Sequence, residues 1–532
     1  MQLLHTKAEL AAWRRQGTGP LHFVPTMGAL HKGHQRLIRR AVEPGAGIGP
    51  RVLVSVFVNP LQFGPQEDYG RYPRTLAADL ELAATAGASA LFAPSLEELY
   101  PGGVEQLTWI RPPQALQRAL CGNNRPGHFE GVATVVVRLL SLVRPDRLLL
   151  GEKDWQQLLI LRRVVADLGL PLVVQGCATV READGLACSS RNRYLDSHQR
   201  RQAAALPTAL AAALAAAARS GAEPLAGQLQ KQVRLALQAA GLAIDYVALL
   251  EAHTLVPLPV DSPLPVAGLA LLAAAVHCGP SRLIDHTFLM RRSPIVAIDG
   301  PAGAGKSTVT RAFAERLGLI YLDTGAMYRA VTWLVLQSGV DPAEAAAIAP
   351  LLASLDLQLD RADDGGQRVR INGVDVTEAI RSPEVTAQVS LVAAHGCVRE
   401  ALTRQQQAMG ERGGLVAEGR DIGTAVFPDA ELKVFLTATT AERARRRALD
   451  LEQRGYPPPP LAELEAQIAE RDHRDSSRAV APLRQAADAV ELVSDGLTIE
   501  AVIQTLLDLF RERVPEEAWP AGGAGSEGPQ AC

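Results

Sequence analysis

The sequence predicts an α/β fold built as two successive units, and three observations lead to it. Short apolar runs alternate with segments of helical periodicity, which is the pattern of strands and helices in a parallel sheet. This alternation begins at residues 21–25 and begins again at residues 295–299, each time with a glycine-containing loop between the apolar run and the helix. The two halves share no internal repeat, so duplication of one domain is not indicated.

The first unit is predicted from the order of its apolar and helical segments. The apolar run at residues 21–25 precedes a glycine turn and a helical pattern, and a second apolar run follows at residues 51–58. Residues 147–150 and 155–169 repeat the order of strand and helix. We therefore expect a core with a parallel sheet over about residues 1–190.

A smaller subdomain is expected next, at about residues 191–285. From about residue 197 the composition changes to a helix rich in alanine and leucine, and strand-like runs follow at residues 245–252 and 269–276. Together with the core, this subdomain would complete a first domain of residues 1–290.

The second unit repeats the order of strand, glycine loop and helix, with the strand at residues 295–299 and the helix at residues 306–318. A basic pair and a proline at residues 291–294 precede this strand, so we place the domain junction there and expect a second domain over residues 291–514. Residues 515–532 are rich in proline, glycine and alanine without periodicity, and we predict a disordered tail.

The composition limits the class of function. The 54 basic and 57 acidic residues nearly balance, so nothing global indicates a nucleic acid or a membrane surface as a partner. The apolar stretches are too short or too interrupted for the ~20 residues of a spanning helix, and the N-terminus lacks the order of a signal peptide. The six cysteines form no CxxC pair, which argues against a zinc site and a redox dithiol. We expect a soluble, cytoplasmic protein.

Residues 24–34, with the sequence VPTMGALHKGH, carry the first candidate site. His31 and His34 are three residues apart, so on the first turn of a helix they share one face. Gly28 and Gly33 allow close approach of the backbone to a ligand, and a helix N-terminus offers free N–H groups to phosphate oxygens. Such a pair could neutralise and protonate a phosphate during transfer. Two packed or surface histidines are the alternative interpretation of this motif taken alone.

Further motifs in the first unit decide between these interpretations. They are FVNPLQF at 57–63, DYGRYPRT at 68–75, RPGHFEGVATVV at 125–136, GEKDWQQL at 151–158 and VREADGLACSSRN at 180–192. With them, the first unit closely resembles pantothenate synthetase (pantoate–β-alanine ligase), a Rossmann-like family of the nucleotidylyltransferase group with the HxGH signature. The resemblance implies that ATP and pantoate form pantoyl adenylate with loss of pyrophosphate, and that β-alanine then attacks the adenylate to give pantothenate and AMP.

The same resemblance assigns residues to an ATP site. His34 matches the proton donor, His31 lies beside it on the phosphates, and Lys153 would meet phosphate. Asp154 would lie on the ribose side or at the metal. The implied ATP site comprises Met27, Gly28, Ala29, Leu30, His31, Lys32, Gly33, His34, Gly151, Glu152, Lys153, Asp154, Val180, Cys188, Ser189, Ser190 and Arg191.

The resemblance also implies groups that hold the acyl substrate and the transition state. Ser189 and Arg191 belong to a segment that, with Val180, matches the loop closing over the nucleotide, and both are candidates to stabilise charge on the transferring group. Gln62 and Gln157 match amides that hold pantoate, and Gln62 also borders the β-alanine site. An amide suits a hydroxy acid because it offers both a donor and an acceptor.

Three positions leave questions to the structure. Cys188 stands where the family usually has methionine, which preserves a backbone contact but not a packing role of the side chain on adenine. Trp155 is bulkier than expected at its position. For Lys153 a surface salt bridge is the alternative interpretation, although only six of the 54 basic residues are lysines.

The second candidate site is the loop at residues 300–307, GPAGAGKS, which fits G-x-x-x-x-G-K-[ST] between a strand and a helix. Backbone N–H groups of such a loop cradle phosphates, Lys306 reaches the β/γ oxygens and Ser307 can ligate Mg²⁺. The motif indicates a nucleoside triphosphate site, which switches, motors and kinases share. The expected ATP contacts are Gly300, Pro301, Ala302, Gly303, Ala304, Gly305, Lys306, Ser307 and Thr308.

Other motifs of the second unit select among these classes. They are YLDTGAMYRA at 321–330, INGVDVT at 371–377, EGRDIGTAVFPDA at 418–430 and ERDHRDSSRAVAPL at 470–483. With them, the second unit resembles bacterial cytidylate kinase, a P-loop nucleoside monophosphate kinase, which implies phosphorylation of CMP or dCMP by ATP with Mg²⁺. Lys306 and Arg478 would act in catalysis, and Asp421 would bind sugar hydroxyls. The implied CMP site comprises Thr324, Ser390, Arg399, Arg420, Asp421, Arg471, Asp475 and Arg478.

Arginines crowd the segment where such kinases have a mobile lid. Phosphoryl transfer between two nucleotides concentrates negative charge, which Mg²⁺ and arginines must offset. For the run at residues 443–447 a solvated helix face is an equally good interpretation.

The leading hypothesis is a bifunctional enzyme with two independent sites, whose substrates are pantoate, β-alanine, ATP and CMP or dCMP. One alternative keeps the P-loop half as a nucleotide-dependent switch attached to a synthetase. Another keeps the synthetase half as a degenerate dimerisation platform. The resemblance is also compatible with a homodimer through the first unit.

Overall fold

The computed structural model describes residues 1–43, 49–64, 67–218, 223–361, 367–453, 455–478 and 480–520, and it divides the chain into two compact units. Among these residues, the first unit holds Met1–Arg291 together with Phe510–Pro520, and the second unit holds Arg292–Leu509. The division falls beside the basic pair and proline from which the junction was predicted.

The structure corrects the predicted disordered tail, residues 515–532, at its beginning. Pro515 and Trp519 are buried within the first unit. The prediction of disorder was based on the composition of residues 515–532, which is dominated by small and polar residues. The few apolar side chains at the start of this segment have little weight in such a composition. The remainder of the predicted tail, residues 521–532, lies outside the described residues.

The core of the first unit is a six-stranded sheet in which every neighbouring pair is parallel. Its strand order is β1-β4-β3-β2-β5-β6, so the loops after β2 and β5 emerge side by side at the carboxyl edge. The strands are β1 (Gln2–Leu4), β2 (Leu21–Thr26), β3 (Arg51–Val56), β4 (Ala90–Phe92), β5 (Arg147–Gly151) and β6 (Val173–Cys177).

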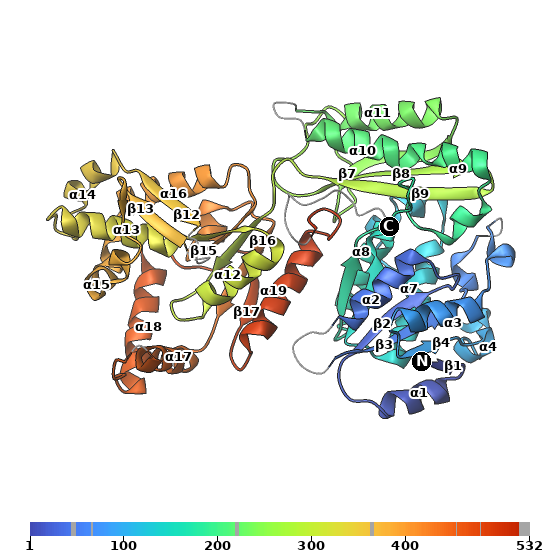
Figure 1. Cartoon of the computed structure of the whole chain (residues 1–532), viewed down its shortest axis with the longest axis horizontal. Coiled ribbons are helices and arrows are strands. Elements are labelled where there is room, and N and C mark those ends of the chain that lie inside the picture. Colours follow the sequence, from blue (N-terminus) through green and yellow to red (C-terminus); the bar gives the residue numbers. More distant parts are fainter. Residues whose placement is uncertain are drawn as a thin grey trace. The chain divides into compact units, whose positions relative to one another are not determined.

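Helices cover both faces of this sheet (Figure 1). Val52 and Val54 of β3 pack with α2 and α3, whereas Leu53 between them packs with α1, α7 and α8. The alternation follows from the two-residue period of a strand, and it explains why the consecutive residues Val52, Leu53 and Val54 of β3 are all apolar. The helices of the core are α1 (Lys7–Arg15), α2 (Lys32–Val42), α3 (Leu76–Thr85), α4 (Leu96–Leu99), α5 (Gln114–Gln117), α6 (Leu120–Asn124), α7 (His128–Val143) and α8 (Trp155–Asp167).

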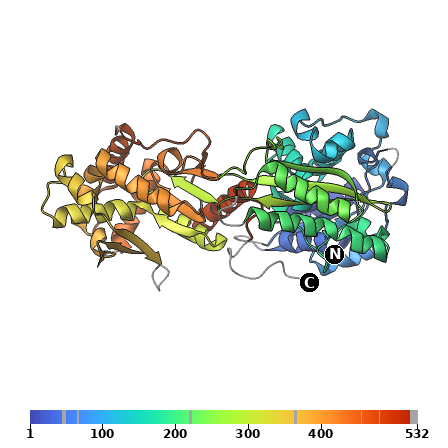
Figure 2. The same cartoon turned by 90° about the horizontal axis from the view of Figure 1, so that it is seen from above.

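The subdomain is an antiparallel sheet of three strands with two helices packed on one face (Figures 1 and 2). Helix α10 buries Leu206, Ala209, Leu210 and Ala213 in the shared apolar cluster, and its small residues permit close approach to the sheet. The elements are α9 (Ser197–Ala203), α10 (Ala205–Ala217), α11 (Ala226–Ala239), β7 (Ala243–Glu251), β8 (Ala270–Cys278) and β9 (Ser281–Leu289).

The second unit is built on a five-stranded parallel sheet of order β11-β15-β10-β16-β17. The central strand β10 leads into the glycine loop, and β15 beside it ends at the same edge. The predicted α/β fold with parallel sheets is thus confirmed in both units. The strands are β10 (Ile295–Asp299), β11 (Ile320–Asp323), β15 (Leu415–Gly419), β16 (Leu432–Thr437) and β17 (Val490–Val493).

A small antiparallel sheet and eight helices complete the described part of the second unit. None of the helices in the described residues is long and apolar enough to cross a membrane. The remaining elements are β12 (Leu357–Arg361), β13 (Gln367–Ile371), β14 (Val374–Asp375), α12 (Lys306–Leu317), α13 (Thr324–Gln337), α14 (Ala345–Leu352), α15 (Pro383–Val392), α16 (Gly396–Met409), α17 (Thr440–Gln453), α18 (Leu461–Ser477) and α19 (Ile499–Arg513), whose last residues belong to the first unit.

Candidate active sites

The turns after β2 and β5 border a cavity of about 250 Å³ in the first unit. A second cavity of about 810 Å³ shares Gln62, Lys153, Ser189 and Arg191 with it, so the two spaces meet at these four side chains. The predicted site residues that line the smaller cavity are Met27, His31, Gly33, His34, Gln62, Gly151, Lys153, Asp154, Gln157, Val180, Cys188, Ser189, Ser190 and Arg191.

The rest of the predicted ATP site, Gly28, Ala29, Leu30, Lys32 and Glu152, does not line this cavity. The N–H groups of Ala29 and Leu30 donate to the two carboxylate oxygens of Asp79, at 3.0 and 2.7 Å, and are therefore not free for phosphate. Asp79 is 2% exposed and lies on α3. Sequence reasoning missed this residue, because no local motif marks a buried aspartate that supports a distant turn.

The two histidines cap the helix that carries them. His31 is the N-cap of α2, and its Nδ1 accepts the N–H of Gly33 at 3.2 Å. The Nδ1 of His34 accepts the N–H of His31 at 3.3 Å, and the ring centroids are 4.1 Å apart. Because each Nδ1 is an acceptor, each neutral ring carries its proton on Nε2. Two Nε2–H donors are thus held together in a site that can receive phosphate.

Both imidazoles are neutral at pH 7 without a ligand. Burial, followed by the positive charges of Lys153 and Arg193, lowers the pKa of His31 to about 4. Burial, then His31 and Lys153, lowers the pKa of His34 well below its usual value. Without a ligand, the pair therefore offers hydrogen bonds from neutral rings and does not supply the positive charge expected from the sequence. A bound anion would raise both pKa values and so favour protonation of the rings.

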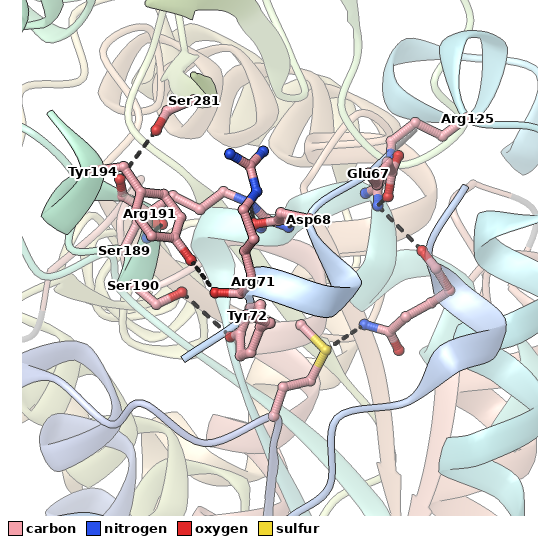
Figure 3. Close-up of polar contacts among 12 residues, drawn as sticks. Glu67, Asp68, Arg71, Tyr72, Arg125, Ser189, Ser190, Arg191, Tyr194 and Ser281 are labelled. Carbon is pink, nitrogen blue, oxygen red and sulfur yellow. Dashed lines mark hydrogen bonds and ion pairs between the residues drawn. The ribbon is translucent and has the colours of Figure 1, made fainter. Parts of the chain in front are cut away.

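Arg191 is held by a carboxylate at the junction of the two cavities (Figure 3). Its Nε and Nη2 donate to the carboxylate of Asp68 at 3.1 and 2.8 Å. The hydroxyl of Ser189 accepts the N–H of Arg191 at 3.3 Å, and the hydroxyl of Ser190 donates to that of Tyr72 at 3.2 Å. This pairing occupies Nε and Nη2 of Arg191 and leaves the N–H groups of Nη1 to contact a substrate.

Gln62 is oriented by two neighbours, of which the sequence had indicated only Met27 as a site residue. Its Oε1 accepts from the amide of Asn59 at 3.2 Å, and its Nε2 donates to the sulfur of Met27 at 2.9 Å. Asn59 is 1% exposed and accepts at Oδ1 from the hydroxyl of Tyr100, at 3.0 Å. Gln157 lines the same cavity, so the two predicted pantoate amides are brought together.

The three positions left open by the sequence have distinct outcomes. Cys188 is buried, lines the cavity and donates its backbone N–H to the carbonyl of Val180 at 2.8 Å. Trp155 is a core residue, because its Nε1 donates to the carbonyl of Ala252 at 2.6 Å and its ring packs edge to face on Phe288. Lys153 lines both cavities and lies 3.5 Å from Asp154, whose side chain is 48% exposed, so this ion pair faces both the site and the solvent.

In the second unit, a cavity of about 910 Å³ brings the predicted kinase residues together. All eight residues of the predicted CMP site line it, as do residues 302–308 of the glycine loop. Gly300 and Pro301 do not line it. A Cβ at Gly300 would lie 2.0 Å from the carbonyl oxygen of Leu436, and its φ is +149°, so the start of the loop requires glycine.

Lys306 is folded onto its own loop. Its Nζ donates to the carbonyls of Gly300 and Pro301 at 2.7 and 2.8 Å, and the residue is 7% exposed. Burial, followed by the charge of Arg420, lowers the pKa of Lys306 to about 7. The lysine is therefore poised to gain a proton when phosphate arrives.

This pKa predicts a pH-dependent affinity for ATP. As the pH rises above 7, Lys306 in the free protein loses its proton, whereas a bound triphosphate would keep Lys306 protonated. Binding of ATP should therefore take up a proton, and the affinity for ATP should fall as the pH rises. Titration calorimetry at pH 8 in two buffers of different ionisation enthalpy measures this uptake. The variant K306M should show less uptake, and identical uptake in parent and variant would contradict the prediction.

An acidic residue absent from the predicted site faces the motif serine. The hydroxyl of Ser307 donates to Oε1 of Glu418 at 2.6 Å, and the hydroxyl of Thr324 donates to the Glu418 carbonyl at 2.7 Å. The other carboxylate oxygen, Oε2, is buried without a hydrogen-bond donor among the residues that the structure describes. Burial, then Asp323, raises the pKa of Glu418. A hydroxyl beside an unsatisfied carboxylate is an oxygen donor set that fits Mg²⁺.

The arginines of the cavity have unused donors. The Nε atoms of Arg399 and Arg471 and the Nη2 of Arg478 are buried without a hydrogen-bond acceptor in the described part of the chain. Arg399 pairs with Asp421 in a buried ion pair, and Nη2 of Arg478 lies 3.5 Å from the same carboxylate. Buried guanidinium N–H groups without acceptors indicate an anionic ligand with several oxygens.

Within the arginine run at residues 443–447, some arginines contact the glycine loop and others lie on a solvated helix face. Arg443 is buried, donating to the carbonyl of Ala302 at 3.1 Å and pairing with Asp472 at 2.6 Å. Arg446 donates to the carbonyl of Ala304 at 3.3 Å, so these two arginines support the glycine loop. Arg445, with 60% of its side chain exposed, fits the solvated helix face.

Comparisons with known proteins identify two families, one for each unit. The family model described as pantoate-beta-alanine ligase matches residues 2–288, and that described as cytidylate kinase matches residues 296–512. A protein of Prochlorococcus marinus (strain MIT 9313), named bifunctional pantoate ligase/cytidylate kinase, is 65% identical over 96% of this chain and 99% of its own length. A protein of Parasynechococcus marenigrum (strain WH8102) with the same name is 64% identical over 97% of this chain and 99% of its own length. The crystal structure of pantothenate synthetase from Thermus thermophilus aligns with a TM-score of 0.49 and 46% identity, over 54% of this chain and 98% of that structure.

Proposed function

Because the chain belongs to the family of bifunctional pantoate ligase/cytidylate kinases, we propose that its first unit condenses pantoate with β-alanine and its second unit phosphorylates CMP or dCMP. ATP is the co-substrate at both sites. The observation that carries this proposal is the presence of two separate cavities, each lined by the complete catalytic set expected for one of the reactions.

In the first reaction, a carboxylate oxygen of pantoate attacks the α-phosphorus of ATP, and the bond to pyrophosphate breaks. The Nε2–H groups of His31 and His34 and the ammonium of Lys153 stabilise the charge on the transferring and leaving phosphates. Gln62 and Gln157 hold pantoate. The β-alanine amine then attacks the acyl carbon of the adenylate, loses a proton and displaces AMP.

Negative charge on the transferring group is offset by the guanidinium of Arg191, and an oxygen of this group accepts a hydrogen bond from the hydroxyl of Ser189. Asp68 orients Arg191 through Nε and Nη2, and Nη1 donates to a substrate oxygen. Cys188 packs beside Gly33, where an added Cβ would lie 3.7 Å from the Cys188 Cβ, so its side chain shapes the wall that receives the nucleotide.

In the second reaction, a phosphate oxygen of CMP attacks the γ-phosphorus of ATP and ADP leaves. Lys306 moves from its loop carbonyls to the β- and γ-oxygens, and the unused N–H groups of Arg399, Arg471 and Arg478 receive phosphate oxygens. Asp421 holds Arg399 and Arg478 in place in addition to any contact with the sugar. The CMP site is completed by Thr324, Ser390, Arg420, Asp421 and Asp475.

Mg²⁺ is the metal that the kinase site would bind, through Ser307 and Glu418 together with the phosphates of ATP. Its positive charge would offset the negative charge on the β- and γ-phosphate oxygens. No group of three or more metal-binding side chains occurs among the described residues, which suits a metal held mainly by phosphate and water.

A coupled assay of the whole chain with each substrate pair tests both activities. AMP should form only when pantoate, β-alanine and ATP are present together, and ADP release should depend on CMP. ATP hydrolysis indifferent to CMP would support a nucleotide switch in the second unit. Absence of AMP formation would support a degenerate first unit.

Two further aspects of the proposal concern the setting of the enzyme. We place the enzyme in the cytoplasm, where ATP is available and where the cysteines that the structure describes remain as free thiols. A homodimer through the first unit is tested by light scattering of the purified chain, which would give twice the mass of 56.7 kDa.

A further inference from the structure

The last described residues of the chain, Phe510–Pro520, belong to the first unit although they follow the second unit in sequence. Phe510, Val514 and Trp519 are buried, with 0%, 1% and 8% of their surface exposed. The Nη1 of Arg511 donates to the carbonyl of Trp519 and closes the segment on itself. Residues 510–520, the C-terminal segment, are thus anchored by apolar side chains and an internal hydrogen bond.

Backbone N–H groups of the C-terminal segment donate hydrogen bonds to a buried carboxylate beside the ligase cavity. Glu152 lies between Gly151 and Lys153 and is 1% exposed, and its two carboxylate oxygens accept the N–H groups of Glu516 and Glu517, each at 2.8 Å. Burial raises the pKa of Glu152 to about 7, and these two N–H groups oppose that rise. Without the C-terminal segment, the carboxylate would lose both donors.

The side chains of the same two glutamates hold the loop that follows β6. Oε2 of Glu517 accepts from the hydroxyl of Thr179 at 2.7 Å, and its Oε1 accepts from Nη2 of Arg181 at 3.2 Å. Oε2 of Glu516 accepts the N–H of Ala178 at 3.4 Å. Ala178 and Thr179 line the cavity of the histidine pair, so both glutamates act directly behind the wall of the nucleotide site.

These contacts reach other elements around the cavity. Arg181 also pairs with Asp285 of β9, at 2.7 and 3.1 Å, which fixes its guanidinium against Glu517. Oε1 of Glu516 accepts from Arg36 of α2 at 3.3 Å, two residues beyond His34. The C-terminal segment therefore links α2, the turn after β5 and the loop after β6.

We propose that the C-terminal segment is a positioning element of the ligase site, in which Glu517 holds the Ala178–Arg181 loop in the conformation that receives ATP. Adenylate formation in the first unit then depends on residues that follow the kinase unit in sequence. The inference rests on the ligase function proposed above. It also implies that a fragment ending near residue 290 lacks part of its own site.

The test compares the full chain with the variant E517A and with a chain that ends at Val514, which keeps the whole of α19. The KM for ATP in pantothenate formation is expected to rise roughly tenfold, because hydrogen bonds to charged groups contribute factors of that size. The kcat should change less, and CMP phosphorylation should be unchanged. The variant E517Q keeps an oxygen acceptor for Thr179 and should recover part of the loss.

Two controls match these changes. E491A removes an exposed carboxylate from β17, and a chain ending at Pro520 removes only residues outside the described part of the chain; both should behave as the parent. With an active parent, an unchanged KM for ATP in E517A and in the chain ending at Val514 overturns the proposal. A lower melting temperature with unchanged KM at a temperature where both variants are folded also overturns it, since that is the behaviour of a structural brace. An inactive parent would instead contradict the ligase function.

Discussion

Replacing His34 with asparagine is expected to lower pantothenate formation on the order of a hundredfold to a thousandfold, the range of one preorganised hydrogen-bond donor at a transferring phosphate. The amide of asparagine can occupy the place of Nδ1 and still accept the N–H of His31, but it has no counterpart of the Nε2–H. The variant thus separates the chemical role from the helix cap. The measurement is the steady-state rate of AMP release with saturating pantoate and β-alanine.

The comparison with H34A and H198A makes this result specific. H34A also removes the cap acceptor and should lose helix stability of about 1 kcal/mol besides activity, whereas H34N should keep the melting temperature of the first unit. His198 is an exposed histidine of the same unit, so H198A should retain full activity. CMP phosphorylation should be unaffected in all three variants, and wild-type AMP release by H34N would rule out His34 as the donor.

Replacing Lys306 with methionine is expected to lower CMP phosphorylation on the order of a hundredfold to a thousandfold, as for loss of one preorganised charge at a transferring phosphate. Methionine is close in volume to lysine and cannot contact the β- and γ-oxygens. The measurement is ADP release in the presence of CMP, with pantothenate formation by the same variant as the internal control.

The stability of the second unit distinguishes this loss from misfolding. Lys306 has a folded pKa of about 7 against an ordinary value of 10.5, so the unfolded chain binds the extra proton. Burial of the charged lysine lowers the free energy of unfolding by its full amount below pH 7, and this loss disappears as the pH rises toward 10.5. K306M should therefore be at least as stable as the parent at pH 7. A lower melting temperature together with normal CMP phosphorylation would contradict the assigned role.

The elements of both parallel sheets could be predicted because their signals are local. An apolar run, a glycine turn and a helical period identify β2 with α2 and β10 with α12. His31, His34 and Lys306, which we propose to contact phosphate, lie within those turns. The chemistry of the His31 and His34 pair and of Lys306 is local in the same sense. The comparisons with relatives confirm the two families that these motifs indicated.

The residues that hold the site side chains in place could not be predicted, because they are distant in sequence from the side chains that they contact. Asp79 holds the turn before His31, Asn59 orients Gln62, and Glu418 faces Ser307 across 111 positions. Asp79 stands in no motif, and the motifs that contain Asn59 and Glu418 do not indicate which side chains these two residues contact. Their roles depend on which strands and helices become neighbours.

The sequence alone determined the two α/β units, their order and the two uses of ATP, since short-range patterns encode strands, helices and phosphate loops. Tertiary structure decided the neutral state of the histidines, the pairing of Arg191 with Asp68 and the place of residues 510–520 in the first unit. The physical reason is that burial and charge pairing arise only after packing brings distant segments together. Residues 510–520, with three glutamates and one tryptophan, have no local periodicity that indicates which elements they contact.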